Sequence, residues 1–210
     1  MTGEPMTADA DDVARKKAAA PGLKLPPPGN GMTSRRRLRN RLAAVFFNAI
    51  ITHIPSHTIR QGYLRAFGAH IGQKTAIMRG TQVFDIEFLT IGSETAVGWR
   101  CLLDGRGGLY IGDNVTIASD VHILGGTRDI NHRDFALVPI PTVIEDYAWI
   151  ASRAMILPSH IKRGAVIAGQ AFVMADIGEC EVVGGNPAKV ISKRDPDALQ
   201  YSAGYRPLFS

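Results

Sequence analysis

An aliphatic residue returns at every sixth position along most of the stretch from residue 71 to residue 173. The five sets are Ile71, Ile77 and Val83; Ile91, Val97 and Leu103; Ile111, Ile117 and Ile123; Ile144, Ile150 and Ile156; and Ile161, Ile167 and Val173. A period of six fits neither an α-helix, at 3.6, nor an alternating strand, at 2. It is typical of an all-β solenoid whose coils have three short flat sides, each with one aliphatic side chain pointing inward. Because one coil alone exposes half of its core, several coils must stack, and five are enough.

The places where the repeat breaks are as informative as the repeat. From Val83 to Ile91 the step is eight residues, and the same step recurs in the next set, so two residues are expected to bulge at each of these corners. From Ile123 to Ile144 the step is twenty-one, which predicts a projecting loop over residues 125–141. Long loops on a rigid scaffold frequently carry function.

The segments before the repeat differ in composition. Residues 1–34 are rich in Ala, Asp, Pro and Gly and are expected to be disordered. Residues 35–68 predict a short helical cap of two helices, which would close the open end of the solenoid. The first helix is predicted over residues 35–54, and Pro55 would end it. Its predicted buried face consists of Leu38, Leu42, Val45, Phe46, Ala49 and Ile50.

With 210 residues, the chain has room for one main domain and its appendages. We assign residues 69–192 to the solenoid and residues 193–210 to a tail that packs on it or on a neighbouring subunit. The net charge is +5, and five arginines lie between Arg35 and Arg41. The basic excess is therefore local, and no nucleic-acid partner is expected. A second interpretation of the cap, compatible with the first, is peripheral contact with an anionic membrane through these arginines and Phe46 or Phe47.

The two cysteines, Cys101 and Cys180, fall on separate coils without a spacing motif. This argues against a disulfide framework or a zinc site and favours a reducing cytoplasm. The N-terminal segment lacks the apolar stretch of a secretory signal. We therefore expect a cytoplasmic protein, with the inner face of the membrane as an additional location.

Three motifs carry a family resemblance: Leu-Asp-Gly-Arg-Gly-Gly over residues 103–108, Tyr-Ala-Trp-Ile-Ala-Ser-Arg-Ala over 147–154, and Gly-Gly-Asn-Pro-Ala-Lys over 184–189. With these motifs the chain resembles the hexapeptide-repeat O-acyltransferases, which include the maltose and galactoside acetyltransferases. The resemblance covers roughly residues 40–193, and the helical lead-in is similar to the branch that modifies surface sugars and polysaccharides.

The resemblance implies a left-handed parallel β-helix of about five coils that forms a homotrimer with active sites between subunits. It also implies transfer of an acetyl group from acetyl-CoA to a hydroxyl of a sugar, glycolipid or polysaccharide precursor, with other acyl-CoA donors left open. Seven residues are the expected contacts of the CoA moiety: Ser152, Gly169 and Ala171 beside the pantetheine, Trp149 as a wall, and Lys189, Lys193 and Arg194 at the phosphates. A lysine that many relatives carry in the last coils is replaced by Ala175.

The largest departure from the family lies in the projecting loop. Acetyl transfer to a hydroxyl needs a base, and relatives carry a histidine in this loop just before an Asp or Pro. Here Arg128 stands in that position, before Asp129. An arginine cannot act as a base in a protein.

Three accounts of this departure are open. In the first, His132 on the same loop has become the base, oriented by Asp129 or Asp134, and Arg128 binds developing negative charge. In the second, the base is Asp104 or His122. In the third, the chain has lost the chemistry and is a binding or scaffold protein.

A zinc site would be an alternative, because some solenoids of this kind bind zinc through three histidines. Here His122 and His132 lie near each other in the sequence, and the other four histidines, His53, His57, His70 and His160, lie elsewhere. No metal is therefore expected.

Overall fold

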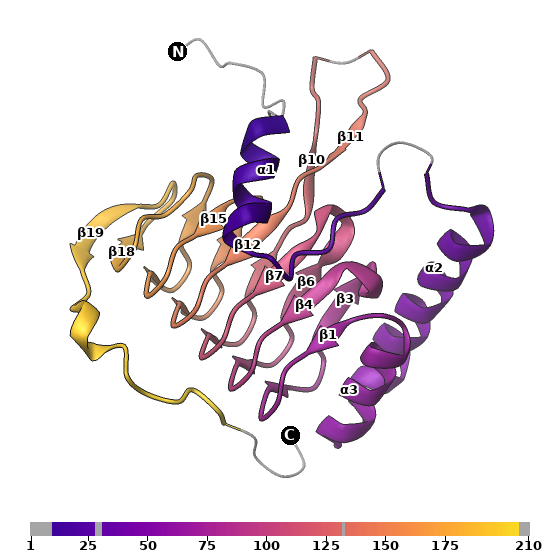
Figure 1. Ribbon diagram of the computed structural model, residues 1–210, viewed down its shortest axis with the longest axis horizontal. Coiled ribbons are helices and arrows are strands. Elements are labelled where there is room, and N and C mark those ends of the chain that lie inside the picture. The colour runs from indigo at the N-terminus through magenta and orange to yellow at the C-terminus, as the bar shows by residue number, and fades with distance from the viewer. Residues whose placement is uncertain (1–9, 28–30, 132, 206–210) are drawn as a thin grey trace.

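The computed structural model describes residues 10–27, 31–131 and 133–205. Three sheets form the sides of a solenoid (Figure 1). Sheet A contains β1 (His70–Ile71), β4 (Leu89–Ile91), β7 (Leu109–Ile111), β12 (Thr142–Ile144) and β15 (His160–Ile161). Sheet B contains β2 (Ala76–Ile77), β5 (Ala96–Val97), β8 (Thr116–Ile117), β13 (Trp149–Ile150), β16 (Val166–Ile167), β18 (Glu181–Gly184) and β19 (Lys189–Lys193). Sheet C contains β3 (Gln82–Phe84), β6 (Leu102–Asp104), β9 (His122–Ile123), β14 (Met155–Ile156) and β17 (Phe172–Val173).

The predicted solenoid is confirmed, with its five aliphatic sets on five coils. Ile71 pairs with Ile91 and Ile91 with Ile111, so equivalent residues of successive coils lie in register. All fifteen aliphatic residues of the five sets are buried, and they belong to one core. A partial sixth turn follows, in which Ile177 bridges to Ile161 and β18 extends sheet B.

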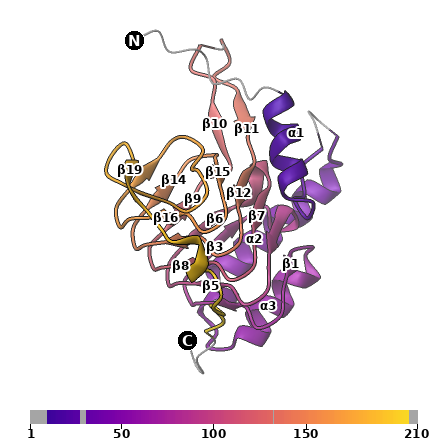
Figure 2. The same cartoon turned by 60° about the vertical axis from the view of Figure 1, so that its left-hand side comes forward.

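The corner between sheets C and A is where the repeat breaks. The two steps of eight contain short 3₁₀ turns, η2 (Ile86–Phe88) and η3 (Gly105–Gly107). The step of twenty-one contains an antiparallel hairpin of β10 (Gly126–Arg128) and β11 (Leu137–Pro139), which projects from the solenoid (Figures 1 and 2). Both predicted bulges and the predicted loop are confirmed.

These three insertions pack on one another along the edge of the solenoid. A Cβ on Gly105 would lie 2.7 Å from the carbonyl oxygen of Asp85, just before η2. A Cβ on Gly107 would overlap the carbonyl oxygens of Gly125 and Ile140, at the base of the hairpin. We call this stack, which consists of residues 85–88, 104–108, 125 and 140, the corner ridge.

The cap consists of α2 (Ser34–Ala49), η1 (Ile51–His53) and α3 (His57–Ala66). The Thr33 hydroxyl accepts from the Arg36 N–H, and the Ser56 hydroxyl from the Ile59 N–H, so each α-helix has a polar N-cap. Phe47 is fully buried in the same core as the inward residues of the first coil. The predicted helical cap is therefore confirmed.

Cap side chains also satisfy the exposed backbone edge of the first coil. A parallel sheet that ends here would leave unpaired N–H and C=O groups. The bonds, one set for each sheet, run from Arg65 to the Ile71 carbonyl at 3.0 Å, from Arg60 to the Ile77 carbonyl at 2.7 Å, and between Asn48 and both backbone groups of Val83 at 2.9 and 3.1 Å.

The predicted buried face of the first helix is wrong. The residues of α2 that are buried are Asn40, Ala43, Ala44 and Phe47. The six residues predicted to be buried, Leu38, Leu42, Val45, Phe46, Ala49 and Ile50, are all exposed. The end of the first coil presents its core surrounded by backbone groups, so α2 places Phe47 in the core and approaches the backbone through small side chains and amides. The larger apolar face of α2 is left outside.

The expectation of disorder over residues 1–34 is also wrong for residues 10–27, which are ordered and pack on the solenoid. This segment contains α1 (Ala10–Ala19), and Ala20 and Leu23 pack against Val143 on the outer face of sheet A. The Gly22 carbonyl accepts a hydrogen bond of 2.9 Å from the Thr90 hydroxyl. The part of sheet A around Thr90 and Val143 is therefore covered by the chain's own N-terminal segment (Figure 1).

The far end of the solenoid is closed differently. Strand β19 turns back and pairs with β18 in the antiparallel sense. The tail contains η4 (Pro196–Ala198) and returns along the solenoid, where the Ala203 N–H donates to the Asn114 side chain. Within the described ranges 10–27, 31–131 and 133–205, no helix is long and apolar enough to cross a bilayer.

Candidate functional site

The residue at the family's histidine position, Arg128, ends β10 and is paired with Leu137. Its guanidinium donates to the Phe135 carbonyl at 2.9 Å and lies 5.2 Å from the centre of the Phe135 ring. Arg128 therefore braces the two strands of the hairpin, in addition to carrying an exposed positive charge there.

The tip of the hairpin holds the other loop candidates. Asp129 accepts from the Asn131 N–H at 2.9 Å, and its own N–H donates to the Ala136 carbonyl, so it shapes the turn. Asp134 lies 3.7 Å from Arg133. His132, the candidate base, lies outside the described residues, so its relation to Asp129 and Asp134 stays a prediction.

Asp104 is fully buried at the base of the corner ridge. One carboxylate oxygen accepts from the Arg106 N–H at 3.0 Å, and the guanidinium of Arg106 reaches the other at 2.6 Å. The bond to Asp104 raises the pKa of Arg106 above its usual range. Nearby Asp85 has a pKa raised by burial and, secondarily, by Asp104. An acid so fully engaged is a positioning group for the ridge and is poorly suited to accept a proton from a substrate.

His122 is exposed on the outer face of sheet C, as predicted from its alternation with inward Ile123. It lines a hollow of about 550 Å³ at the corner between sheets B and C, together with Arg100, Asp120 and Arg153. Arg100 binds Asp120 through two bonds of 2.8 and 2.9 Å, and this holds the pKa of Asp120 below its usual range. Neither arginine was predicted from the sequence as a site residue. Arg100, Asp120 and Arg153 occupy the same position on three successive coils, so an alignment of the repeats would have found the two arginines.

Three of the four residues expected beside the pantetheine or as a wall are on the surface. Trp149 is 48% exposed on the outer face of sheet B. Ser152 and Gly169 are neighbours on adjacent coils, because a Cβ on Gly169 would meet only the Ser152 carbonyl, at 3.3 Å. The side chain of Ala171 is 1% exposed and faces the core, so a contact with CoA would involve its backbone, and this contact stays a prediction.

The three expected phosphate contacts lie on β19 or directly after it. Lys189 and Lys193 are exposed at the two ends of β19. Arg194 donates to the Tyr147 carbonyl at 3.1 Å and to the Tyr201 hydroxyl at 3.0 Å. It therefore holds the tail on the solenoid, which is a different role from the predicted one.

The described residues give no cluster of three or more His, Cys, Asp or Glu side chains that could hold a metal ion. Chemically, the arrangement offers a projecting polar hairpin on one edge and a shallow surface with small residues and one tryptophan on another.

A protein described as the colanic acid biosynthesis acetyltransferase WcaF of Escherichia coli (strain K12) is 30% identical to this chain over 132 residues. The match covers 62% of this chain and 72% of that protein. The chain belongs to the hexapeptide-repeat acetyltransferase family. The predicted family and the predicted class of enzyme are thereby confirmed. No protein-family model matches the sequence.

Solved structures of such acetyltransferases have the same fold. One from Vibrio cholerae, solved with acetyl coenzyme A, superimposes with a TM-score of 0.68 at 22% identity over 80% of this chain and 93% of that one. A maltose O-acetyltransferase from Clostridium difficile gives a TM-score of 0.62 at 23% identity over 77% and 87% of the two chains.

Proposed function

We propose that the protein transfers an acetyl group from acetyl-CoA to a hydroxyl of a sugar or glycan precursor. The observation that carries this proposal is the 30% identity to an acetyltransferase of colanic acid biosynthesis, over most of that protein's length. Similarity of fold to a maltose O-acetyltransferase favours a sugar hydroxyl as the acceptor. A fold by itself does not specify an acceptor, so the sugar is left as a class.

The proposed base is His132, which lies in the sequence between β10 and β11. It removes the proton of the acceptor hydroxyl while the oxygen attacks the thioester carbon. The C–S bond then breaks, and CoA leaves as a thiol after taking up a proton. A positioned histidine is worth roughly 10²–10⁴ in rate at neutral pH. Arg128 would stabilise negative charge that develops on the thioester oxygen, because its fixed fork of donors suits an anion.

We further propose that the active unit is a homotrimer with acetyl-CoA in a groove between solenoids. The N-terminal segment already covers part of sheet A, which favours sheets B and C for contacts between subunits. The outer row of sheet B carries the small residues Ala96 and Thr116, which allow close packing. Trp149, Ser152, Gly169, Lys189 and Lys193 are the proposed donor contacts on this side.

The proposed location is the cytoplasm, at the inner face of the membrane. Cys101 and Cys180 are buried free thiols, and burial raises the pKa of Cys101 to about 11. This suits a compartment in which thiols stay reduced. Any contact with an anionic membrane would be made by Phe46 and the arginines of α2, since Phe47 is buried.

The test follows release of free thiol from acetyl-CoA in the presence of a panel of sugars. His132→Ala should lower turnover by roughly 10²–10⁴ and leave CoA affinity nearly unchanged, since the loss falls on the transition state. His70→Ala is the matched control, because His70 is an exposed histidine on sheet A. Light scattering should give about three times 22.7 kDa.

Two further variants separate the accounts of the base. His122→Ala should leave turnover unchanged if His132 acts alone. If Arg128→His raises activity strongly while His132→Ala has no effect, the chain is a decayed relative that kept the scaffold. CoA binding without turnover on any acceptor would favour the same conclusion.

A further inference from the structure

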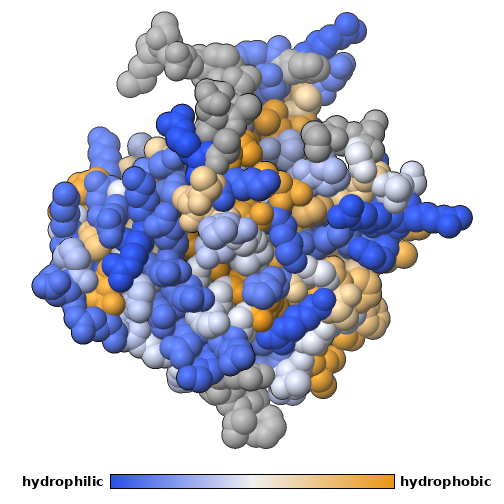
Figure 3. Space-filling model, viewed as in Figure 1, coloured by the Kyte–Doolittle hydropathy of each residue, from blue (hydrophilic) through white to orange (hydrophobic). Residues whose placement is uncertain are grey.

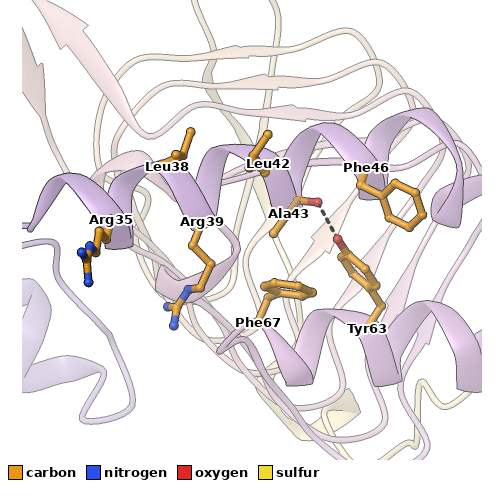
Figure 4. Close-up of a pocket in the computed structure, with 8 residues that line it drawn as sticks. All are labelled: Arg35, Leu38, Arg39, Leu42, Ala43, Phe46, Tyr63 and Phe67. Atoms are coloured by element: carbon orange, nitrogen blue, oxygen red, sulfur yellow. Dashed lines mark hydrogen bonds between the residues drawn. The ribbon is translucent and has the colours of Figure 1, made fainter.

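The outward face of α2 and the neighbouring face of α3 form an apolar hollow of about 520 Å³. Figure 4 shows Leu38, Leu42 and Phe46 along α2, with Ala43 and Phe46 next to Tyr63 and Phe67 of α3 and with Leu38 and Leu42 on the side of α2 away from α3. Leu38 and Leu42 are 58% and 59% exposed. Figure 3 shows hydrophobic residues gathered over this side of the molecule. Exposed apolar surface of this kind marks a place where something binds.

One end of the hollow is strongly basic. Arg35 and Arg39 line it at the N-terminal end of α2, whereas the opposite end is closed by aromatic rings (Figure 4). The five arginines of α2 have one acidic partner among the described contacts, Glu87, which binds Arg36 at 2.6 Å and Arg39 at 3.6 Å. The positive end of the helix dipole adds to the same potential. The hollow therefore has an apolar body and an anion-binding mouth.

The mouth lies beside the corner ridge. Glu87, which binds Arg39, belongs to η2, the first step of that ridge. The base of the hairpin is the third step, two coils further along. Neighbouring coils are about 4.8 Å apart, so the mouth and the hairpin base are separated by roughly 10 Å along the edge. This is the span of a phosphate group with one attached sugar.

We propose that the hollow binds one hydrocarbon chain of an amphiphile with a phosphate headgroup, and that this amphiphile carries the acceptor sugar. The chain lies along α2 from Arg35 to Phe46, a length of about 16 Å. This is about half of the ~30 Å hydrocarbon core of a bilayer, so it matches one lipid chain. The phosphate binds Arg35 and Arg39, and the sugar lies along the corner ridge towards the hairpin. The role of the sugar rests on the proposed function, whereas binding of the amphiphile does not.

The test is a calorimetric titration of the full-length protein with decyl phosphate below its micelle concentration. Inorganic phosphate and decanol serve as probes for the head and the tail alone. Decyl phosphate should bind more tightly than either, and affinity should rise about fourfold for each methylene in an alkyl phosphate series. Leu42→Glu should weaken binding at least about tenfold, because it places a like charge in the path of an anionic ligand. The double substitution of Arg35 and Arg39 to Gln should weaken decyl phosphate about tenfold and leave decanol unchanged.

Val45→Glu is the matched control. Val45 is exposed on the same helix but does not line the hollow, so its substitution should leave decyl phosphate binding unchanged. Equal losses in Val45→Glu and Leu42→Glu would overturn the proposal and favour general adhesion to a bilayer. A change in oligomeric state on Leu42→Glu, with no binding by the wild type, would overturn it and assign the hollow to a second copy of the chain. Titration of the same samples with acetyl-CoA shows separately whether the donor site is intact.

Discussion

The two long faces of α2 differ in the side chains that they bury and in the hydrogen bonds that they form. The inward face is narrow and carries Ala43, Ala44 and Phe47 between two asparagines, Asn40 and Asn48. The outward face carries larger and more apolar side chains and leaves them in solvent. The comparison teaches that the helix face that packs on the end of the solenoid is the one whose side chains can hydrogen-bond to the exposed backbone groups. The more hydrophobic face of α2 therefore remains exposed and available to another partner.

The largest effect should come from the centre of the inward face. Phe47→Ala removes a fully buried ring from the core that joins α2 to the first coil, and should cost about 3–5 kcal/mol of unfolding free energy. Denaturant unfolding measures this. Phe46→Ala, one residue away and about half exposed, is the control and should cost under about 1 kcal/mol. Equal losses would mean that both faces are buried in solution.

A smaller effect is expected where the inward face bonds to the sheet edge. Asn48→Ala leaves the N–H and carbonyl of Val83 without their side-chain partner, and should cost about 1–3 kcal/mol. Hydrogen exchange should then become faster at the Val83 amide and at few other amides of the first coil. An unchanged Val83 amide would show that water replaces the asparagine without cost.

The ion pair between the two faces should give a pH-dependent effect. The bond from Arg36 holds the pKa of Glu87 below its usual range, with a further contribution from Asn40. Because the folded pKa is the lower one, the stability is present above the unfolded value of about 4.3 and is lost as the pH falls through the folded value. Glu87→Gln should therefore cost up to about 1 kcal/mol at pH 7, because solvent screens this partly exposed pair, and less below pH 4. Thermal melts of both proteins across this range provide the measurement, and a difference that widens in acid would contradict the assignment.

The smallest effect should come from the outward face. Leu42→Glu should change stability by less than about 0.5 kcal/mol, because the side chain is already in solvent. Thermal melting and light scattering check this together. A loss of several degrees or a change in mass would show that an assembly covers this face.

The repeat could be predicted closely from the sequence, because the inward positions of a solenoid recur at a fixed spacing and each one needs an apolar residue. The corner insertions could be predicted from the places where this spacing becomes longer than six residues. The burial of the Ala171 side chain follows from the same period, because Ala171 occupies the same column as the buried residues Val121 and Ala154. Its contact with a cofactor was expected from the resemblance alone and stays a prediction.

The inward face of α2 could not be predicted from the helix alone. A hydrophobic periodicity identifies the more apolar face, and here the partner surface is an array of peptide groups that needs amides and small residues. The ordered structure of the N-terminal segment could not be predicted from the sequence for a similar reason. Ala20 and Leu23 bury little by themselves and gain their contacts only from the finished face of sheet A. The base could be narrowed to a short list, since Asp104 proved to be engaged with Arg106.

The corner ridge also fixes the distance between the cap and the hairpin in units of one coil. Successive strands of the first three coils are offset by twenty residues, as in the pairing of Ile71 with Ile91 and of Ile91 with Ile111. The distance between the cap and the hairpin can therefore change only in whole coils, each of about 4.8 Å. Loss or duplication of one such block would leave both ends chemically intact and shift their separation by one step. In this architecture, the distance between two functional elements changes in steps of one coil, and gain or loss of a repeat is the mutation that changes it.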